Sequence, residues 1–318
     1  MKRLAFTATS VALLPLALSS CAAFDDSAST ADGVEVAAAF YPLQYVAERV
    51  AGPHASVANL TSPGDDPHDL ELTVSETAEV TQADLVIYEH GFQPAVDDAV
   101  DVNAEGATLD VADAVELRPA EEHDHEHADD EHEAEHAEDD HADHDHGDLD
   151  PHFWQDPLLM ADLADAVADQ LAQTDPDHED DYRANAADLR TDLETLDAAY
   201  ADGLAQCERN IVVVAHDAFG YLGRYGLEFE PIAGLSPDAE PTPADLGHLQ
   251  EVIEDEGITT VFYESLVSPA IAEQLANDTG AQVAVLDPVE GLSDQTAGED
   301  YLSLMKSNLT ALEEANGC

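Results

Sequence analysis

The chain has 318 residues, 44% of them hydrophobic, and its 9 basic against 71 acidic side chains give a formal net charge of −62. This length is about twice that of a typical domain and predicts two domains, each with enough chain to bury a core. So large an acidic excess repels nucleic-acid phosphates and anionic lipid headgroups, which excludes a nucleic-acid-binding protein and a basic membrane-surface protein.

Residues 1–21 predict a lipoprotein signal peptide. Lys2 and Arg3 precede an apolar stretch that is too short to span a bilayer, and small residues then lead into Cys21. This pattern resembles the bacterial lipobox, at which the peptide is cut and the cysteine is acylated. We expect the lipid on Cys21 to anchor the protein to the outer face of the cytoplasmic membrane, with residues 22–33 as a tether. An ordinary signal peptide with a chance cysteine is the alternative.

Short β-rich runs alternate with helical stretches along the rest of the chain, which predicts an α/β fold with parallel sheets. We expect an N-terminal lobe over residues 34–174 and a C-terminal lobe over residues 207–318. The expected strands are Val34–Ala39, Ser56–Leu60, Asp84–Tyr88, Ile211–Ala215, Thr259–Tyr263 and Gln282–Leu286.

Residues 121–150 have an unusual composition: eight histidines and sixteen acidic residues, with no aromatic, β-branched or basic residue. Such a segment cannot pack a core, so a disordered loop is expected within the N-terminal lobe. Its imidazoles predict weak accessory zinc binding, and an inert solvated loop is the alternative. The histidines are His123, His125, His127, His132, His136, His141, His144 and His146. The remaining acidity is spread along the chain, which fits either a saline habitat or no special habitat.

A long helix is predicted between the two lobes, over residues 175–206. Apolar residues recur every three or four positions from Tyr182 to Leu204 on an otherwise charged segment. Asp175 can cap this helix, with Pro176 at its first position. At 1.5 Å per residue, a helix of about 30 residues is roughly 45 Å long, which favours a rigid connection between lobes over a surface helix within one domain.

Three histidines and one aspartate stand where α/β proteins place ligands, after the carboxyl ends of strands. These are His68, His152, His216 and Asp287. Three neutral imidazoles and one carboxylate form a closed set of four ligands suited to Zn²⁺. An isolated histidine, however, is more often a cap or a satisfied polar residue.

At these positions the sequence resembles the ZnuA-type zinc-binding lipoproteins, the solute-binding components of metal ABC importers. The matching segments are Phe40–Leu43, Pro67–Glu71, Asp150–Trp154, Ala215–Tyr221, Ile232–Pro237 and Leu286–Leu292. The resemblance implies two α/β lobes joined by one long helix, with the metal site in the cleft between the lobes. It also implies a monomer that passes Zn²⁺ to an ABC permease and its ATPase. The family's metal ligands fall on His68, His152, His216 and Asp287.

The resemblance also bears on the choice of metal and on nearby residues. Manganese-type relatives tend to carry a carboxylate at the position of His216, so the histidine favours zinc, as does the histidine-rich insertion. There are two alternatives to a zinc importer component. One is a manganese- or iron-binding member of the family, and the other is a zinc buffer or adhesin without a transporter. Ser265 stands where a proline is expected and leaves the role of Glu264 open, between a hydrogen bond to a ligand histidine and a plain edge carboxylate. His90 follows a strand and is expected on a surface loop.

An extracytoplasmic zinc hydrolase is a further alternative. A catalytic zinc site keeps an open position, whereas this set spends four protein ligands and includes no His-Glu-x-x-His helix. The sequence therefore favours a binding protein over an enzyme.

Two cysteines remain after Cys21: Cys207 at the end of the long helix, and Cys318, the last residue of the sequence. Leftover cysteines of an exported protein usually pair. We expect a disulfide that fastens a C-terminal helix, about residues 300–316, to the second lobe.

Overall fold

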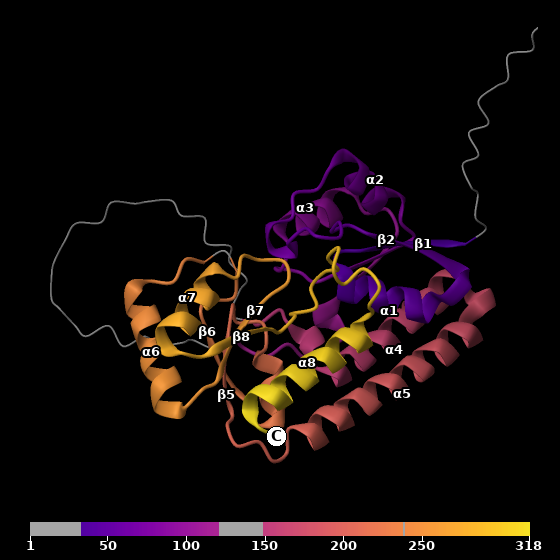
Figure 1. Cartoon of the computed structure of the whole chain (residues 1–318). Helices are drawn as coiled ribbons and strands as arrows, with labels where there is room; N and C mark the ends of the chain where they lie inside the picture. Colours follow the sequence, from indigo (N-terminus) through magenta and orange to yellow (C-terminus); the bar gives the residue numbers. More distant parts are fainter. Residues whose placement is uncertain (1–32, 121–148, 238) are drawn as a thin grey trace, which may run out of the picture. The chain divides into compact units, whose positions relative to one another are not determined.

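The computed structural model of the chain describes residues 33–120, 149–237 and 239–318, and these described residues belong to one compact unit (Figure 1). The signal peptide with Cys21, the tether and the eight histidines of the tract fall outside the described residues, so these expectations and the lobe boundaries stay predictions. No helix in the described part of the chain is both long and apolar enough to cross a membrane.

Two parallel sheets of four strands each form the centres of two α/β lobes, as the sequence predicts. The strand order is β2-β1-β3-β4 in the N-terminal lobe and β6-β5-β7-β8 in the C-terminal lobe. The first sheet contains β1 (Val34–Ala38), β2 (Ala55–Asn59), β3 (Leu85–Tyr88) and β4 (Ala107–Asp110). The second sheet contains β5 (Ile211–Val214), β6 (Glu228–Pro231), β7 (Thr260–Tyr263) and β8 (Gln282–Val285).

The strands β4 and β6 are absent from the sequence prediction. Both lie at an edge of their sheet, and their sequences, ATLD and EFEP, have few of the apolar residues that mark a buried strand. Pairing with the neighbouring strand forms them instead, in the registers Leu85↔Ala107 and Ile211↔Glu228.

Eight α-helices connect and cover these strands in the described part of the chain, joined by short 3₁₀ helices. The α-helices are α1 (Tyr41–Ala51), α2 (Val74–Gln82), α3 (Pro94–Asn103), α4 (Pro157–Thr174), α5 (Glu179–Gly203), α6 (Pro243–Glu256), α7 (Ala270–Thr279) and α8 (Tyr301–Asn316). The 3₁₀ helices are η1 (Gly52–His54), η2 (Pro67–Asp69), η3 (Val111–Asp113), η4 (Phe153–Gln155), η5 (Pro176–His178) and η6 (Gly220–Tyr225).

The predicted long helix is confirmed as η5 followed by α5. The helix α5 packs against α1 and α4, which precede it in the sequence, and against the C-terminal helix α8 (Figure 1). Its apolar stripe is buried, including Tyr182 and Tyr200 at 0% exposure. The predicted side-chain cap is not formed, because Asp175 instead accepts hydrogen bonds from the side chains of His178 and Tyr182.

A disulfide joins Cys207 to Cys318 across 111 positions of sequence, which confirms the predicted pairing. It ties the end of α8 to the segment that follows α5. The backbone N–H groups of Glu208 and Arg209 also donate to the carbonyl oxygen of Asn316. The C-terminal helix is therefore held at the junction between the long helix and the second sheet.

Candidate metal centre

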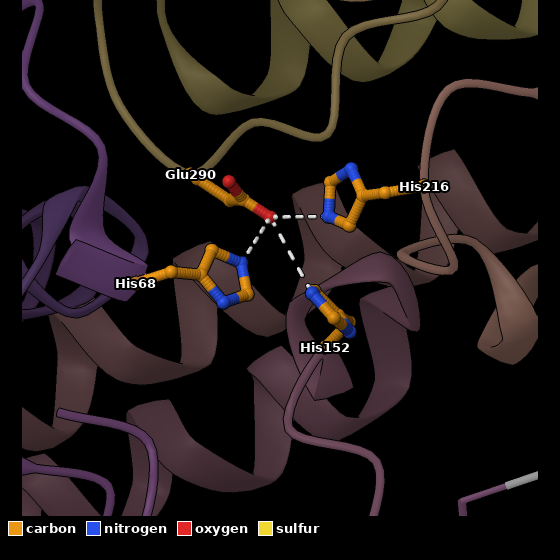
Figure 2. Close-up of side chains that lie close together, drawn as sticks. All are labelled: His68, His152, His216 and Glu290. Carbon is orange, nitrogen blue, oxygen red and sulfur yellow. Dashed lines mark hydrogen bonds and ion pairs between the residues drawn. The ribbon is translucent and has the colours of Figure 1, made fainter. Parts of the chain in front are cut away.

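Three histidines and one glutamate from both lobes converge on one buried point (Figure 2). One possible ligand atom from each of His68, His152, His216 and Glu290 lies within 4.8 Å of the other three. All four side chains are buried, with residue exposures between 0% and 4%. Such burial is rare for ionisable side chains unless they are paired or bind a metal.

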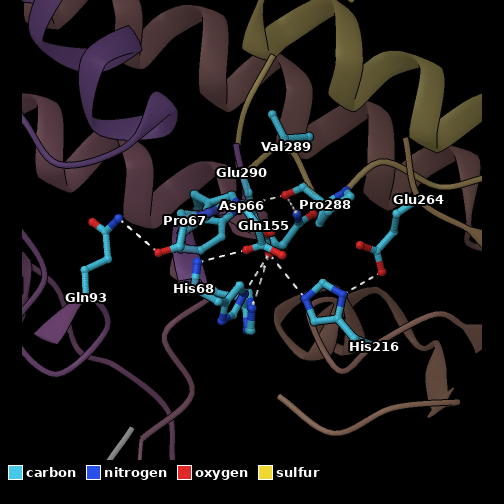
Figure 3. A network of polar contacts seen from close by, with 12 residues as sticks. Asp66, Pro67, His68, Gln93, Gln155, His216, Glu264, Pro288, Val289 and Glu290 are labelled. Atoms are coloured by element: carbon cyan, nitrogen blue, oxygen red, sulfur yellow. Dashed lines mark hydrogen bonds and ion pairs between the residues drawn. The ribbon is translucent and has the colours of Figure 1, made fainter. Parts of the chain in front are cut away.

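His68 lies in η2, on the loop that follows β2. The carboxylate of Asp66 accepts a hydrogen bond from the backbone N–H of His68 and so begins this helical turn. The buried amide of Gln93 donates to the carbonyl oxygen of Pro67 at 3.1 Å (Figure 3). It also donates to the hydroxyl of Thr61, at 3.1 Å. These bonds fix the loop on the sheet and with it the position of His68.

His152 precedes η4 and is fully buried. Its Nδ1 atom lies 2.9 Å from Oδ1 of Asp150, which also accepts the backbone N–H of His152. An Nδ1–H donated to this carboxylate leaves the lone pair on Nε2, the nitrogen that faces the cluster. Burial lowers the pKa of His152, but the neighbouring carboxylates of Asp150 and Glu290 outweigh it and leave the pKa raised.

His216 lies just after β5, where the sequence predicts it, although β5 ends one residue earlier than expected. Its Nδ1 atom lies 2.5 Å from Oε1 of the buried Glu264, which comes directly after β7. Glu264 is therefore in contact with the histidine, the first of the two roles that the sequence left open. Burial lowers the pKa of His216, but the carboxylates of Glu264 and Glu290 outweigh it and raise the pKa well above its usual value.

Glu290 is the acidic member of the cluster. Its Oε1 atom lies 3.4 Å from Nε2 of His68, 3.4 Å from Nε2 of His152 and 3.2 Å from Nε2 of His216 (Figure 2). Burial would raise the pKa of Glu290, but the charges of His68 and His216 and the close contacts with the rings of His152 and His216 hold the pKa well below its usual range. One carboxylate oxygen thus already faces all three imidazoles.

The structure does not bring Asp287 into this cluster. Its Oδ2 atom accepts the hydroxyl of Ser265 at 2.7 Å, and its Oδ1 atom accepts the backbone N–H of Val289 at 2.8 Å. The backbone N–H and carbonyl oxygen of Asp287 are bonded to the side chain of Asn308. Both carboxylate oxygens are therefore used within the C-terminal lobe, and the carboxylate that lies among the three histidines is that of Glu290.

The sequence contains a weak signal for Glu290, because the matching segment Leu286–Leu292 includes two carboxylates. A position directly after a strand favours Asp287. Only the turn at residues 287–289, which carries the chain away from β8, decides between the two. His90 contacts no member of the cluster: its side chain is 67% exposed and its Nδ1 atom lies 3.4 Å from Oδ1 of Asp97.

The donor set determines what the cluster can do chemically. The Nε2 atoms of His152 and His216 are buried and face the Glu290 carboxylate at 3.4 Å and 3.2 Å, but neither makes a hydrogen bond of good geometry within the described residues, which a coordinated cation would explain. Three neutral imidazoles and one carboxylate offset one of the two charges of a divalent ion, and their spacing permits a tetrahedral arrangement. The ring nitrogens, being borderline donors, suit Zn²⁺ better than Mn²⁺, which prefers oxygen ligands.

The fold consists of two lobes with parallel sheets, joined by a long helix, and a buried set of metal donors lies between the lobes. These features define a two-lobed binding protein, and comparison with known proteins identifies its family. Residues 36–315 match the family model described as zinc-uptake complex component A, periplasmic. The chain is 34% identical over 294 residues to the zinc-binding lipoprotein AdcA of Streptococcus pneumoniae strain R6, covering 89% of this chain and 56% of that protein. It is 31% identical to the high-affinity zinc uptake system protein ZnuA of Bacillus subtilis, covering 90% and 89%.

Similar solved structures support the same family. The Zn(II)-bound ZnuA-like domain of Streptococcus pneumoniae AdcA has a TM-score of 0.73 at 31% identity and covers 90% of this chain and all of that one. The laminin-binding protein of Streptococcus agalactiae, described as an adhesin with metal-transporting activity, has a TM-score of 0.76 at 27% identity and covers 89% and 99%. The chain belongs to the ZnuA family of zinc-uptake components. It spans about half, 56%, of the length of AdcA.

Proposed function

We propose that this chain binds one Zn²⁺ ion through His68, His152, His216 and Glu290. The observation that carries the proposal is the convergence of four buried donor groups within 4.8 Å of one another. Asp150 and Glu264 support it, because carboxylates that accept the second ring N–H of a ligand histidine fix the tautomer and raise the basicity of the metal-binding nitrogen. The Zn²⁺-bound neighbour and the zinc-binding names of the relatives point to the same ion.

The ion is cargo in this proposal, and the chain is not an enzyme. A set of four protein donors satisfies the usual coordination of zinc and leaves no position for a substrate or an activated water. The B. subtilis relative is named as part of a high-affinity zinc uptake system. By this likeness the present chain acts as a monomer and presents Zn²⁺ to an ABC permease driven by its ATPase.

The same proposal places the protein outside the cytoplasmic membrane, held by a lipid on Cys21. The signal pattern of residues 1–21 supports this placement, and the S. pneumoniae relative is named a lipoprotein. Replacing Cys21→Ser is expected to move the protein from the membrane fraction to the soluble extracytoplasmic fraction. An unchanged membrane fraction would overturn the anchor while leaving the metal site untouched.

A competition titration of the protein with zinc and manganese tests the site and the metal together. We expect one tight equivalent of zinc that manganese cannot displace, because the set has three imidazoles and one carboxylate. Replacing Glu290→Gln exchanges the charged carboxylate for a neutral amide, a much weaker zinc donor, and is expected to lower zinc affinity by more than about 100-fold, beyond the range typical of residues that only orient a ligand.

The matched variant is Asp287→Asn, which keeps one acceptor for Ser265 or Val289. We expect it to weaken zinc binding by less than about 100-fold, within the range typical of residues that only support a ligand. The opposite ranking of the two variants would assign the fourth ligand to Asp287. Tight manganese binding would instead support a manganese- or iron-binding member of the family. If the protein binds zinc tightly but deleting its gene does not change zinc uptake by the cell, a zinc buffer or adhesin would be supported instead.

A further inference from the structure

The loop that carries Glu290 contains a strained residue. Val289 has φ of 61° and is the one non-glycine residue with positive φ among the described residues. It is also β-branched and fully buried. A β-branched residue in the left-handed region is a genuine outlier, at a cost of order 1–3 kcal/mol, and persists only where the surroundings enforce it.

Two side chains that follow His152 hold this loop from the other lobe. The indole N–H of Trp154 donates to the carbonyl oxygen of Pro288 at 2.8 Å. The amide of Gln155 donates to the same oxygen at 2.5 Å (Figure 3). Both donors lie in η4 and are fully buried. The carbonyl of the residue just before Val289 is thus fixed by the same short segment that begins with a zinc ligand.

From the C-terminal lobe, the loop is held by Asp287 and Asn308. The Asp287 carboxylate caps the backbone N–H of Val289, and the Asn308 side chain bonds both backbone groups of Asp287. The peptide between Pro288 and Val289 is therefore clamped from both sides. In this conformation the Glu290 carboxylate lies 3.2–3.4 Å from the three imidazoles.

We infer that Gln155 is a positioning residue that, through the Pro288 carbonyl, holds Val289 in its left-handed conformation and so presents Glu290 to the metal. This inference rests on the proposed function. The bond from Gln155 offsets the backbone strain at Val289, so its loss shifts the loop toward relaxed conformations in which Glu290 points elsewhere. The measured zinc affinity then falls in proportion to the fraction of protein molecules in which the loop is correctly placed. Because the loop belongs to one lobe and Gln155 to the other, the contact couples the approach of the lobes to completion of the site.

Replacing Gln155→Met removes the donor at nearly constant volume. The Oε1 atom of Gln155 has no hydrogen-bond partner among the described residues, so the substitution removes no hydrogen bond accepted by this side chain. The Pro288 carbonyl keeps its bond from Trp154. One net hydrogen bond predicts a loss of roughly fivefold in zinc affinity, measured by competition with a chelating indicator, and a matching rise in the zinc dissociation rate.

Substitutions at Val289 separate strain from packing. V289G and V289A both remove the buried isopropyl group, but only V289G lets the backbone adopt positive φ without strain. We expect Q155M to cost roughly fivefold in wild type and in the V289A background, and less than about twofold in the V289G background. A merely structural role of Gln155 would not be rescued by glycine in this selective way.

Gln93 provides the matched control, since it is also a buried glutamine that bonds the carbonyl of a residue next to a ligand, here Pro67 beside His68. The cost of Q93M should be the same in all three Val289 backgrounds. An equal cost of Q155M in all three backgrounds would overturn the inference and leave the proposed function standing. Failure of the wild-type protein to bind zinc would overturn the proposed function, and the inference with it.

Discussion

Glu264 lies behind His216, with 2.5 Å between its Oε1 atom and Nδ1 of the imidazole, and both residues are buried. The contact joins the loop after β7 to the loop after β5, at neighbouring strands of the second sheet. A buried carboxylate here is opposite the metal-facing nitrogen, so it orients the ring and strengthens it as a ligand.

Replacing Glu264→Gln should therefore weaken zinc binding by about 10–100-fold while both lobes stay folded. An amide carbonyl can still accept the Nδ1–H but carries no charge to stabilise the ligand. A competition titration measures the loss, and the far-ultraviolet circular dichroism spectrum checks the fold. Glu254→Gln, at an exposed carboxylate of α6, is the control and should not change the affinity. Equal affinities for the E264Q variant and the wild type would remove Glu264 from the site.

Zinc binding should depend steeply on pH. The pKa values of His152 and His216 are raised in the metal-free protein, although burial alone would lower them, because Asp150, Glu264 and Glu290 lie against their rings. Zinc needs the neutral imidazoles, so protons compete with it even above the ordinary histidine pKa of about 6.5. We expect the affinity to fall continuously from pH 8 to pH 5.5, with proton release on binding measured by calorimetry in buffers of different ionisation enthalpy.

The stability of the metal-free protein should have the opposite pH dependence. A raised histidine pKa contributes stability that is fully present below the unfolded value of about 6.5 and is lost as pH rises through the folded value. The lowered pKa of Glu290 contributes stability above about 4.5, the usual value for glutamate, and so holds across this range. The rise in melting temperature caused by zinc should therefore be small at pH 5.5 and large at pH 8. A zinc-induced shift that does not change with pH would contradict the ligand assignment of the two histidines.

The disulfide should be a major contribution to stability. Cys207 and Cys318 close a loop of 111 positions, for which the chain-entropy model gives about 4–5 kcal/mol, with measured values often smaller. The double variant Cys207→Ser, Cys318→Ser should unfold at lower urea concentration than the wild type and expose α8 first to hydrogen exchange. In a Cys21→Ser background, thiol titration of the folded protein should detect no reactive sulfhydryl, and detection of two would contradict the bond.

The histidine-rich tract of residues 121–150, most of it outside the described residues, should bind extra zinc weakly. Imidazole is the ligand, and the many carboxylates attract the cation but raise the histidine pKa values, so this binding should fade below about pH 6. Deleting residues 121–147 should abolish the weak equivalents in a zinc titration and leave one tight site. Unchanged stoichiometry after the deletion would show that the tract stores no metal.

The sequence alone predicts the arrangement of the chain because its signals are local. The central strands are continuous apolar runs, and the apolar residues from Tyr182 to Leu204 have helical spacing along a charged segment. These local patterns predict which residues of each element are buried. His216 can be placed at the carboxyl edge of a sheet because it follows an apolar strand closely. The disulfide follows from having two cysteines left in an exported chain.

Tertiary structure decides what depends on backbone turns and on partners distant in sequence. The left-handed conformation of Val289 determines whether Asp287 or Glu290 lies among the histidines. The sequence does not predict this conformation, because β-branched residues disfavour positive φ. That conformation is held by contacts from Gln155 and Asn308, 133 and 21 positions away from their partners. The edge strands β4 and β6 likewise form through pairing with their neighbours. Such features arise from long-range hydrogen bonds that offset a local preference, and no local pattern encodes them.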